Sequence, residues 1–131
     1  MRYVMMIYEG REQFDARREL GPDHAFWGAW RSYLRALVDA GIYLGGMPLE
    51  AAETTATAVR VRGGERQVQD GPYADTKEQL GGFMVIEVPT LDDALEWAAR
   101  CPAAEYATVE IRPTANLERF FGPEPGDLFR G

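Results

Sequence analysis

The chain has 131 residues, a length typical of one domain with one hydrophobic core. It carries 14 Lys and Arg residues against 21 Asp and Glu residues, and the net charge of −7 disfavours nucleic acid or a membrane surface as a partner. The single cysteine excludes an intrachain disulfide, and the single histidine excludes a multi-histidine metal site.

Targeting segments and nucleotide-binding motifs are not found in the sequence. No apolar run approaches the roughly 20 residues that cross a bilayer, and residues 1–8 lack the basic start and cleavage site of a signal peptide. The glycine pairs lack the G-x-G-x-x-G and Walker spacings that hold phosphates. We therefore expect a soluble, cytoplasmic protein that uses no metal and no cofactor.

The N-terminal part of the chain indicates a strand, a helix and a second strand. Residues 3–8 form a nearly unbroken apolar run, which is typical of a central strand. Residues 9–20 are polar and show no clear period, which indicates a loop or a frayed helical turn. From Pro22, which suits the first position of a helix, apolar residues recur at three- and four-residue spacing until Gly41. Residues 42–44 then form a short strand that ends at the next two glycines.

The rest of the chain indicates a hairpin, two more strands and a second helix. Gly63 and Gly64 are a two-residue turn between alternating segments, and Thr90 with Asp93 resembles a capping box. In chain order, we expect strands at 57–62, 65–69 and 80–88, a helix at 91–101 and a strand at 108–112.

This order of elements predicts an α+β fold with ferredoxin-like βαββαβ topology and an inserted β-hairpin. Both helices need the same face of a mostly antiparallel sheet. The strands around Met5 and Val85 are apolar on both sides, so the second face of the sheet must also be covered. We expect a second copy of the chain to cover it, in a homodimer with a two-fold interface.

Residues 70–83 have the unusual sequence Asp-Gly-Pro-Tyr-Ala-Asp-Thr-Lys-Glu-Gln-Leu-Gly-Gly-Phe. This run resembles the signature of the DGPF-motif group of the YCII-related family, with Tyr73 where the motif has Phe. The resemblance extends to the first strand, the second helix and the last strand. It covers about residues 1–114 as one YCII-related domain and leaves residues 115–131 as a C-terminal tail.

The resemblance implies a dimeric α/β barrel of two ferredoxin-like sheets, with a cleft between the sheet and the helices of each subunit. The wider family includes a dehydrochlorinase of a chlorinated hydroxyquinol, in which acid/base work is assigned to a His–Asp pair. Some DGPF-type proteins are fused to, or encoded beside, extracytoplasmic-function sigma factors. An enzyme and a regulatory accessory are therefore both open hypotheses.

His24 is the side chain with which an ordinary general base would begin, because an unperturbed imidazole titrates near neutral pH. At about the third helical position, the positive end of the helix would keep it neutral. Pro22-Asp23-His24 also resembles the Pro-x-His start of the first helix in YCII-type proteins, where that histidine is the proposed catalytic one. The alternative is a solvated histidine of the first turn, since His24 falls beside Arg31 and Arg35 at the helix edge.

The segment 70–78 gathers the other candidate groups in a loop before a buried strand, where sites are often found. Asp70 or Asp75 would orient His24 or take a proton itself, and Tyr73 would supply a hydroxyl. Asp70 also suits the first position of an Asp-Gly-Pro turn, in which its side chain bonds its own backbone.

Several other residues have a structural and a functional interpretation. Gly81 and its neighbour Gly82 indicate a bulge in the strand, or the close approach of a ligand. Cys101 is expected to be a small core residue. The three tryptophans are expected in the core and the dimer interface rather than as a base-stacking platform.

The leading hypothesis is a small homodimeric protein whose cleft binds a small cyclic or aromatic molecule. As an enzyme it would carry out a cofactor-free proton transfer or elimination, with His24 as base, Asp70 or Asp75 orienting it, and Tyr73 as hydroxyl donor. The alternative is a non-catalytic accessory that binds a ligand or an extracytoplasmic-function sigma factor through a patch including the C-terminal tail.

Overall fold

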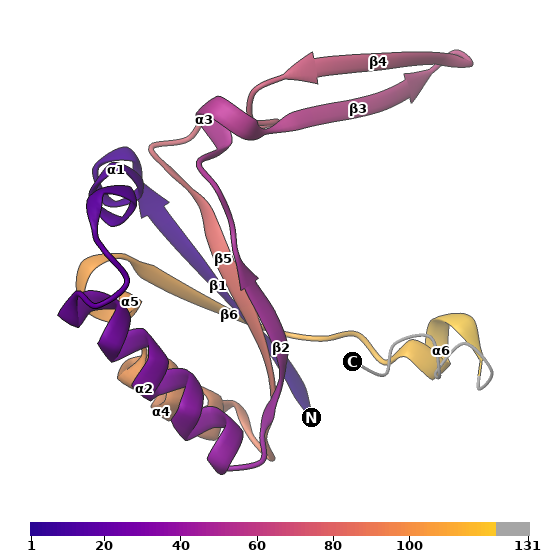
Figure 1. Cartoon of the computed structure of the whole chain (residues 1–131). Helices are drawn as coiled ribbons and strands as arrows, with labels where there is room; N and C mark the ends of the chain where they lie inside the picture. Colours follow the sequence, from indigo (N-terminus) through magenta and orange to yellow (C-terminus); the bar gives the residue numbers. More distant parts are fainter. Residues whose placement is uncertain (123–131) are drawn as a thin grey trace.

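The computed structural model describes residues 1–122, which are built around a four-stranded antiparallel sheet (Figure 1). The strands lie in the order β2-β5-β1-β6, so β1 and β5 are the two central strands. They are β1 (Arg2–Gly10), β2 (Tyr43–Pro48), β5 (Glu78–Glu87) and β6 (Thr108–Pro113). This order confirms the expected α+β fold with ferredoxin-like topology.

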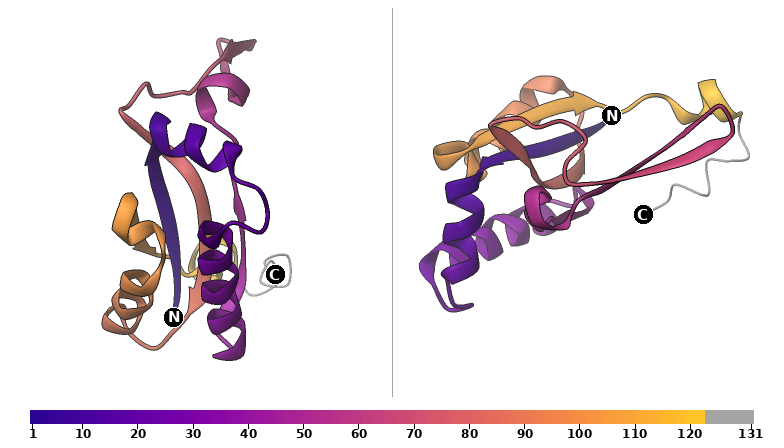
Figure 2. Two further views of the ribbon diagram at one scale, coloured as in Figure 1. Left: turned by 60° about the vertical axis from the view of Figure 1, so that its left-hand side comes forward. Right: turned by 90° about the horizontal axis from the view of Figure 1, so that it is seen from above.

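Helices α2 (Ala25–Asp39) and α4 (Leu91–Arg100) cover one face of the sheet (Figures 1 and 2). A separate hairpin projects away from the sheet, and its turn at Gly63 and Gly64 has φ of 57° and 79°, as expected for a two-residue turn. The remaining elements are α1 (Arg11–Glu19), α3 (Ala52–Thr55), β3 (Thr57–Arg62), β4 (Glu65–Asp70), α5 (Ala103–Tyr106) and α6 (Leu117–Phe121). None of the helices described is long and apolar enough to cross a membrane.

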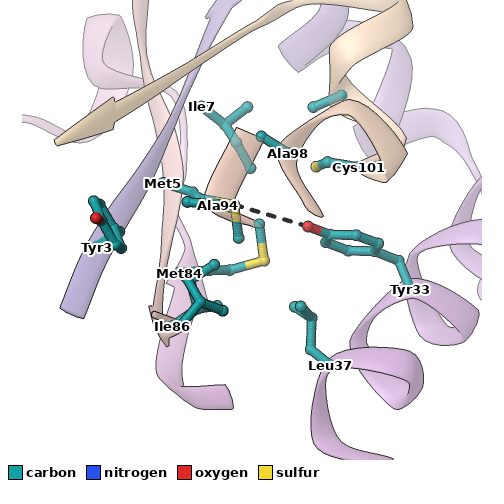
Figure 3. Close-up of a cluster of buried hydrophobic side chains, with 12 residues drawn as sticks. Tyr3, Met5, Ile7, Tyr33, Leu37, Met84, Ile86, Ala94, Ala98 and Cys101 are labelled. Carbon is teal, nitrogen blue, oxygen red and sulfur yellow. Dashed lines mark hydrogen bonds between the residues drawn. The ribbon is translucent and has the colours of Figure 1, made fainter. Parts of the chain in front are cut away.

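The core lies between the sheet and the two covering helices (Figure 3). Side chains of β1 alternate between the two faces of the sheet, and Met5 is fully buried on the helix side, as are Ile86 of β5 and Leu37 of α2. The hydroxyl of Tyr33 donates to the carbonyl oxygen of Trp97 at 2.8 Å, which joins α2 to α4. The expected capping box at the start of α4 is also present.

Helix α1 (Arg11–Glu19) occupies most of residues 9–20, so the expected loop or frayed turn is wrong. The backbone N–H of Gly10 donates to Oε1 of Gln13 at 2.8 Å, which satisfies one free donor at the helix start. Phe14 is buried, and the guanidinium of Arg17 lies 4.6 Å from the centre of its ring. A short helix that packs through one aromatic ring and one arginine leaves no apolar period in the sequence.

Helix α2 begins at Ala25 and not at Pro22, because His24 is its N-cap. The Nδ1 atom of His24 accepts a hydrogen bond from the backbone N–H of Phe26 at 3.0 Å. The imidazole therefore satisfies a backbone N–H donor at the helix start. A side chain inside the first turn would not do this.

Strand β2 continues past its two glycines to Pro48, so the expected end at the glycine pair is wrong. The absence of a side chain at Gly46 brings β2 close to β5. A Cβ at this position would lie 2.3 Å from the carbonyl oxygen of Phe83, far inside normal contact distance. The glycine thus permits pairing of the two strands where the sequence suggested a break.

The face of the sheet opposite the helices carries half-buried apolar side chains, among them Val4, Met6 and Val85. No helix or strand of residues 1–122 packs across this face (Figures 1 and 2). The β3–β4 hairpin and α6 both extend to this side of the sheet, away from α2 and α4. The tail beyond residue 122 lies outside the described residues.

Replacing Gly46 by Ala should destabilise the fold by about 1–3 kcal/mol, because the new methyl group would overlap the backbone of β5. Urea unfolding would measure the free energy of unfolding. Gly21→Ala is the matched control, since a Cβ at Gly21 meets no atom within 4 Å. Equal stability of the two variants would contradict the close approach of β2 and β5.

Candidate active site

A cleft of about 480 Å³ lies between α2 and the helix-facing side of the sheet, with residues of α1 and α5 also in its wall. Its lining is mostly apolar, and the aromatic side chains in it are Phe26, Trp27, Trp30, Tyr43, Phe83 and Tyr106. Three charged side chains reach the same cleft: Glu9, Arg17 and Arg31. A concave apolar site with few polar groups is the usual form of a small-molecule site.

Glu9 and Arg17 form a buried ion pair at this cleft. Nη1 of Arg17 lies 3.3 Å from Oε1 of Glu9, and the side chain of Glu9 is only 3% exposed. The same Nη1 donates to the carbonyl oxygen of Gly81 at 3.3 Å, and Nη2 donates to the carbonyl oxygen of Leu49. Arg17 therefore ties α1 to β1, to β5 and to the segment after β2.

The second carboxylate oxygen of Glu9, Oε2, is buried and has no hydrogen-bond partner. A bulge in β5 makes room for this carboxylate. The β1 partner changes from Gly82 to Leu80 between Ile7 and the next residue, so Gly81 is the extra residue. A Cβ at Gly81 would lie 3.0 Å from Cδ of Glu9, so the bulge expected in the glycine pair serves to admit this side chain.

Burial raises the pKa of Glu9 above its ordinary value, and the positive charge of Arg17 offsets part of this effect. A carboxylate with a raised pKa is a stronger base than an exposed one, and its neutral form is a usable acid. Oε2 is the oxygen of Glu9 that makes no hydrogen bond within the described residues.

Tyr106 lies in the same cleft, where its hydroxyl accepts a hydrogen bond from Nε1 of Trp30 at 3.3 Å. Burial raises the pKa of Tyr106 to about 12; the bond from Trp30 lowers it, and the negative charge of Glu9 raises it again. The phenol is therefore protonated at neutral pH and has a hydrogen to donate to a ligand.

His24, the expected base, is exposed at the start of α2 and is not among the residues that line the cleft. Within residues 1–122, no ion pair joins it to a carboxylate. Asp70 ends β4, and Tyr73 and Asp75 follow in the connection to β5, which lies far from the start of α2 in Figures 1 and 2. The structure thus does not bring His24 together with these three residues, and their catalytic roles stay predictions.

Tyr73 and Asp75 are both exposed, and Tyr73 is 74% exposed. The guanidinium of Arg60 lies 4.8 Å from the centre of the Tyr73 ring, so the aromatic side chain stacks on the hairpin. Among residues 1–122, no group of three or more His, Cys, Asp or Glu side chains is placed to hold a metal ion.

Cys101 is 1% exposed, which confirms its expected place in the core, and burial raises the pKa of its thiol to about 11. Trp30 and Trp97 are partly buried and pack against the core, as expected, and Trp27 and Trp30 also line the cleft. The guanidinium of Arg100 lies 4.2 Å from the ring centre of Trp97.

The site residues predicted from the sequence did not include Glu9, Arg17 or Tyr106. Glu9 continues the two-residue alternation of Tyr3, Met5 and Ile7 on the helix side of β1. The apolar run in the sequence ends at residue 8, so the sequence pattern assigns Glu9 to the polar segment that follows. The position of Arg17 depends on a helix without an apolar period, so no local pattern indicated it.

Comparisons with known proteins agree on family and fold. The model of the YCII-related domain matches residues 1–117. An uncharacterized protein of Rhizobium meliloti (strain 1021) is 42% identical over 96 residues, which are 72% of each chain. Among solved structures, the chain is similar to 5-chloro-2-hydroxyhydroquinone dehydrochlorinase from Burkholderia phenoliruptrix AC1100 in complex with 2,5-dihydroxybenzoquinone, with a TM-score of 0.53 and 15% identity. That likeness covers 88% of this chain and 95% of the other, and at this identity it shows the fold alone.

The pKa of Glu9 predicts how stability depends on pH. Because this pKa is higher in the folded chain than its ordinary 4.5, the folded chain binds more protons than the unfolded one between the two values. The contribution of Glu9 to stability therefore falls as pH rises through that window. We expect the melting temperature of Glu9→Gln, relative to that of the unmodified protein, to increase as pH rises from acidic to neutral.

Thermal unfolding at a series of pH values would measure this difference. Glu12→Gln removes one carboxylate from an exposed position in the first turn of α1, just after β1, and controls for the change in net charge. If the difference in melting temperature between Glu9→Gln and the unmodified protein stays constant with pH, the environment of Glu9 does not disfavour its charge.

Proposed function

This chain belongs to the family of YCII-related domains, and on that premise we propose that it binds a small cyclic or aromatic molecule in the cleft and catalyses a cofactor-free proton transfer or elimination. The observation that carries the proposal is Glu9, a buried carboxyl with a free oxygen and a raised pKa at an aromatic cleft. A dehydrochlorinase with the same fold supports a lyase-like reaction.

In the proposed reaction, Oε2 of Glu9 accepts a proton from a carbon or oxygen of the bound ring. In an elimination, the electron pair of the broken C–H bond forms a new double bond, and the leaving group departs with its own bonding pair. The reaction needs no oxidant or reductant. Glu9 then holds the proton, and its neutral form is favoured by burial.

Two other side chains support this step. Arg17 pairs with the Glu9 carboxylate before proton transfer, so that the base is charged although buried. Tyr106 donates its hydroxyl hydrogen to an oxygen or leaving group of the ring, where negative charge develops. The aromatic walls keep water from the reacting atoms, which strengthens both interactions.

The other assignment places the base at His24, oriented by Asp70 or Asp75, with Tyr73 as hydroxyl donor. Glu9 is favoured because it lines the cleft and is buried there, whereas His24 is exposed and caps α2. A single set of variants distinguishes the two assignments.

The test is chloride release from a panel of chlorinated hydroxyquinols and hydroxylated chlorobenzoates, which includes 5-chloro-2-hydroxyhydroquinone. For the substrate that turns over, Glu9→Gln should lower the rate by about 10²–10⁴-fold, because a positioned base contributes that much. His24→Ala should change it by less than a few-fold. A large loss in His24→Ala with normal turnover in Glu9→Gln would assign the base to His24.

We also propose that two copies of the chain form a homodimer through the open face of the sheet. This face carries the half-buried Val4, Met6 and Val85, and no helix or strand of residues 1–122 packs across it. The hairpin extends to the same side with three exposed valines, Val59, Val61 and Val68. A self-complementary apolar face is suited to a two-fold interface.

Light scattering after size-exclusion chromatography should therefore give twice the mass of the chain. Met6→Glu places a charge on the open face and should give the monomer, because a buried unpaired carboxylate opposes association. Leu95→Glu is the control, since Leu95 is 49% exposed on α4, at the helix-covered side of the sheet. A monomer in the unmodified protein, or a dimer in Met6→Glu, would contradict the proposed interface.

The alternative function, a non-catalytic accessory of an extracytoplasmic-function sigma factor, stays a prediction. The observation in its favour is on α6, where Phe120 and Phe121 are 63% and 58% exposed and could contact a partner. Co-purification of a sigma factor that is lost in Phe120→Ser, together with no turnover of any panel compound, would favour this function over catalysis.

A further inference from the structure

The charges in the cleft do not balance, and we infer from them that the ligand is an aromatic carboxylate whose anionic group binds Arg31. The inference rests on the proposed function, because it names the class of molecule that the same cleft would take. Two guanidinium groups and one carboxylate line the cleft, so its charged side chains sum to one positive charge. The chain as a whole has a net charge of −7.

Arg17 is not available to a ligand, because its guanidinium is already used by the protein. It pairs with the carboxylate of Glu9 and donates to the two backbone carbonyls of Leu49 and Gly81. Its side chain is 13% exposed. Moving it toward a ligand would leave the buried charge of Glu9 without a partner, which is costly.

The guanidinium of Arg31, in contrast to that of Arg17, has N–H donors available for a ligand. Its Nη1 donates to the carbonyl oxygen of Pro22 at 2.9 Å, which fixes the guanidinium beside the segment between α1 and α2. No carboxylate of residues 1–122 forms an ion pair with it. The remaining N–H donors of this planar group match the two oxygens of a carboxylate.

The proposed anion-binding group and the proposed base come from different walls of the cleft. Arg31 belongs to α2 and Glu9 to β1, which form the helix wall and the sheet wall. Trp27 and Trp30 line the same cleft as flat apolar surfaces on which a ring can pack. A ring held by its carboxylate at Arg31 would turn another edge toward Oε2 of Glu9, where a proton can be removed.

The overall negative charge of the chain makes this local excess of positive charge informative. Acidic surroundings repel an anion, so a site that binds one must supply a compensating cation. An uncharged ring would gain less from the guanidinium of Arg31 than an anion would, because hydrogen bonds between opposite charges are stronger than those to neutral acceptors. The geometry therefore favours an anionic over a neutral aromatic ligand.

Isothermal titration calorimetry with 2-naphthoate and 2-naphthamide would test the inference, because the two probes share a ring system and differ in charge. The unmodified protein should bind 2-naphthoate about tenfold more tightly, as expected for one charge-assisted bidentate contact. Arg31→Gln should abolish this preference without weakening the binding of 2-naphthamide, and Arg31→Lys should restore part of it. Arg35→Gln removes the same charge from an exposed position of α2 outside the cleft and should keep the preference.

Three results would overturn the inference: equal affinity of the two probes, a preference that survives in Arg31→Gln, or no binding of either probe. An equal loss of affinity for both probes in Arg31→Gln would instead assign Arg31 a purely structural role at Pro22, and would also overturn it. Glu9→Gln separates this inference from the proposed reaction. This variant should keep the preference for 2-naphthoate even where it abolishes turnover. The carboxylate-binding role of Arg31 and the proposed reaction at Glu9 can therefore be refuted independently of each other.

Discussion

The ion pair between Glu9 and Arg17 is the interaction on which the arrangement of this protein depends. Burying a carboxylate is expensive unless a positive charge and hydrogen bonds compensate it. Arg17 supplies the charge, and it also donates to backbone carbonyls of two other segments. One side chain thereby fixes α1 against the central strand, the bulged strand β5 and the segment that follows β2. The position of α1 in turn shapes one end of the cleft.

The same pair connects the stability of the fold with its chemistry. A structural salt bridge would normally satisfy both carboxylate oxygens, but Oε2 of Glu9 is left without a partner at an apolar cleft. Gly81 shows that the backbone of β5 bulges to admit this carboxylate. Buried groups of this kind cost stability and are most easily understood where they act on a ligand. The family and the fold do not by themselves define a reaction, since function lies in the site that a fold carries.

Most of the secondary structure followed from local patterns. The apolar run of β1, the glycine turn of the hairpin and the capping box at Thr90 are each determined by a few neighbouring residues. Helix α1 did not follow, because its packing depends on Phe14 and Arg17 meeting groups that are distant in sequence. His24 was expected inside the first turn of α2, but a histidine can also accept a backbone N–H, and it is the N-cap.

The sequence alone determined the antiparallel sheet and the order of its strands and of the two long helices, because hydrophobic periods and turn residues act over short distances. It did not place Glu9, because the apolar run ends at residue 8, whereas β1 extends to Gly10 and carries Glu9 on its helix side. Only the tertiary structure decided which charged groups meet. Glu9, Arg17, Tyr106 and Arg31 come from four elements, and no local pattern relates them. Their proximity arises from the crossing of α2 over the sheet and from the docking of α1, which depend on contacts between segments far apart in the chain.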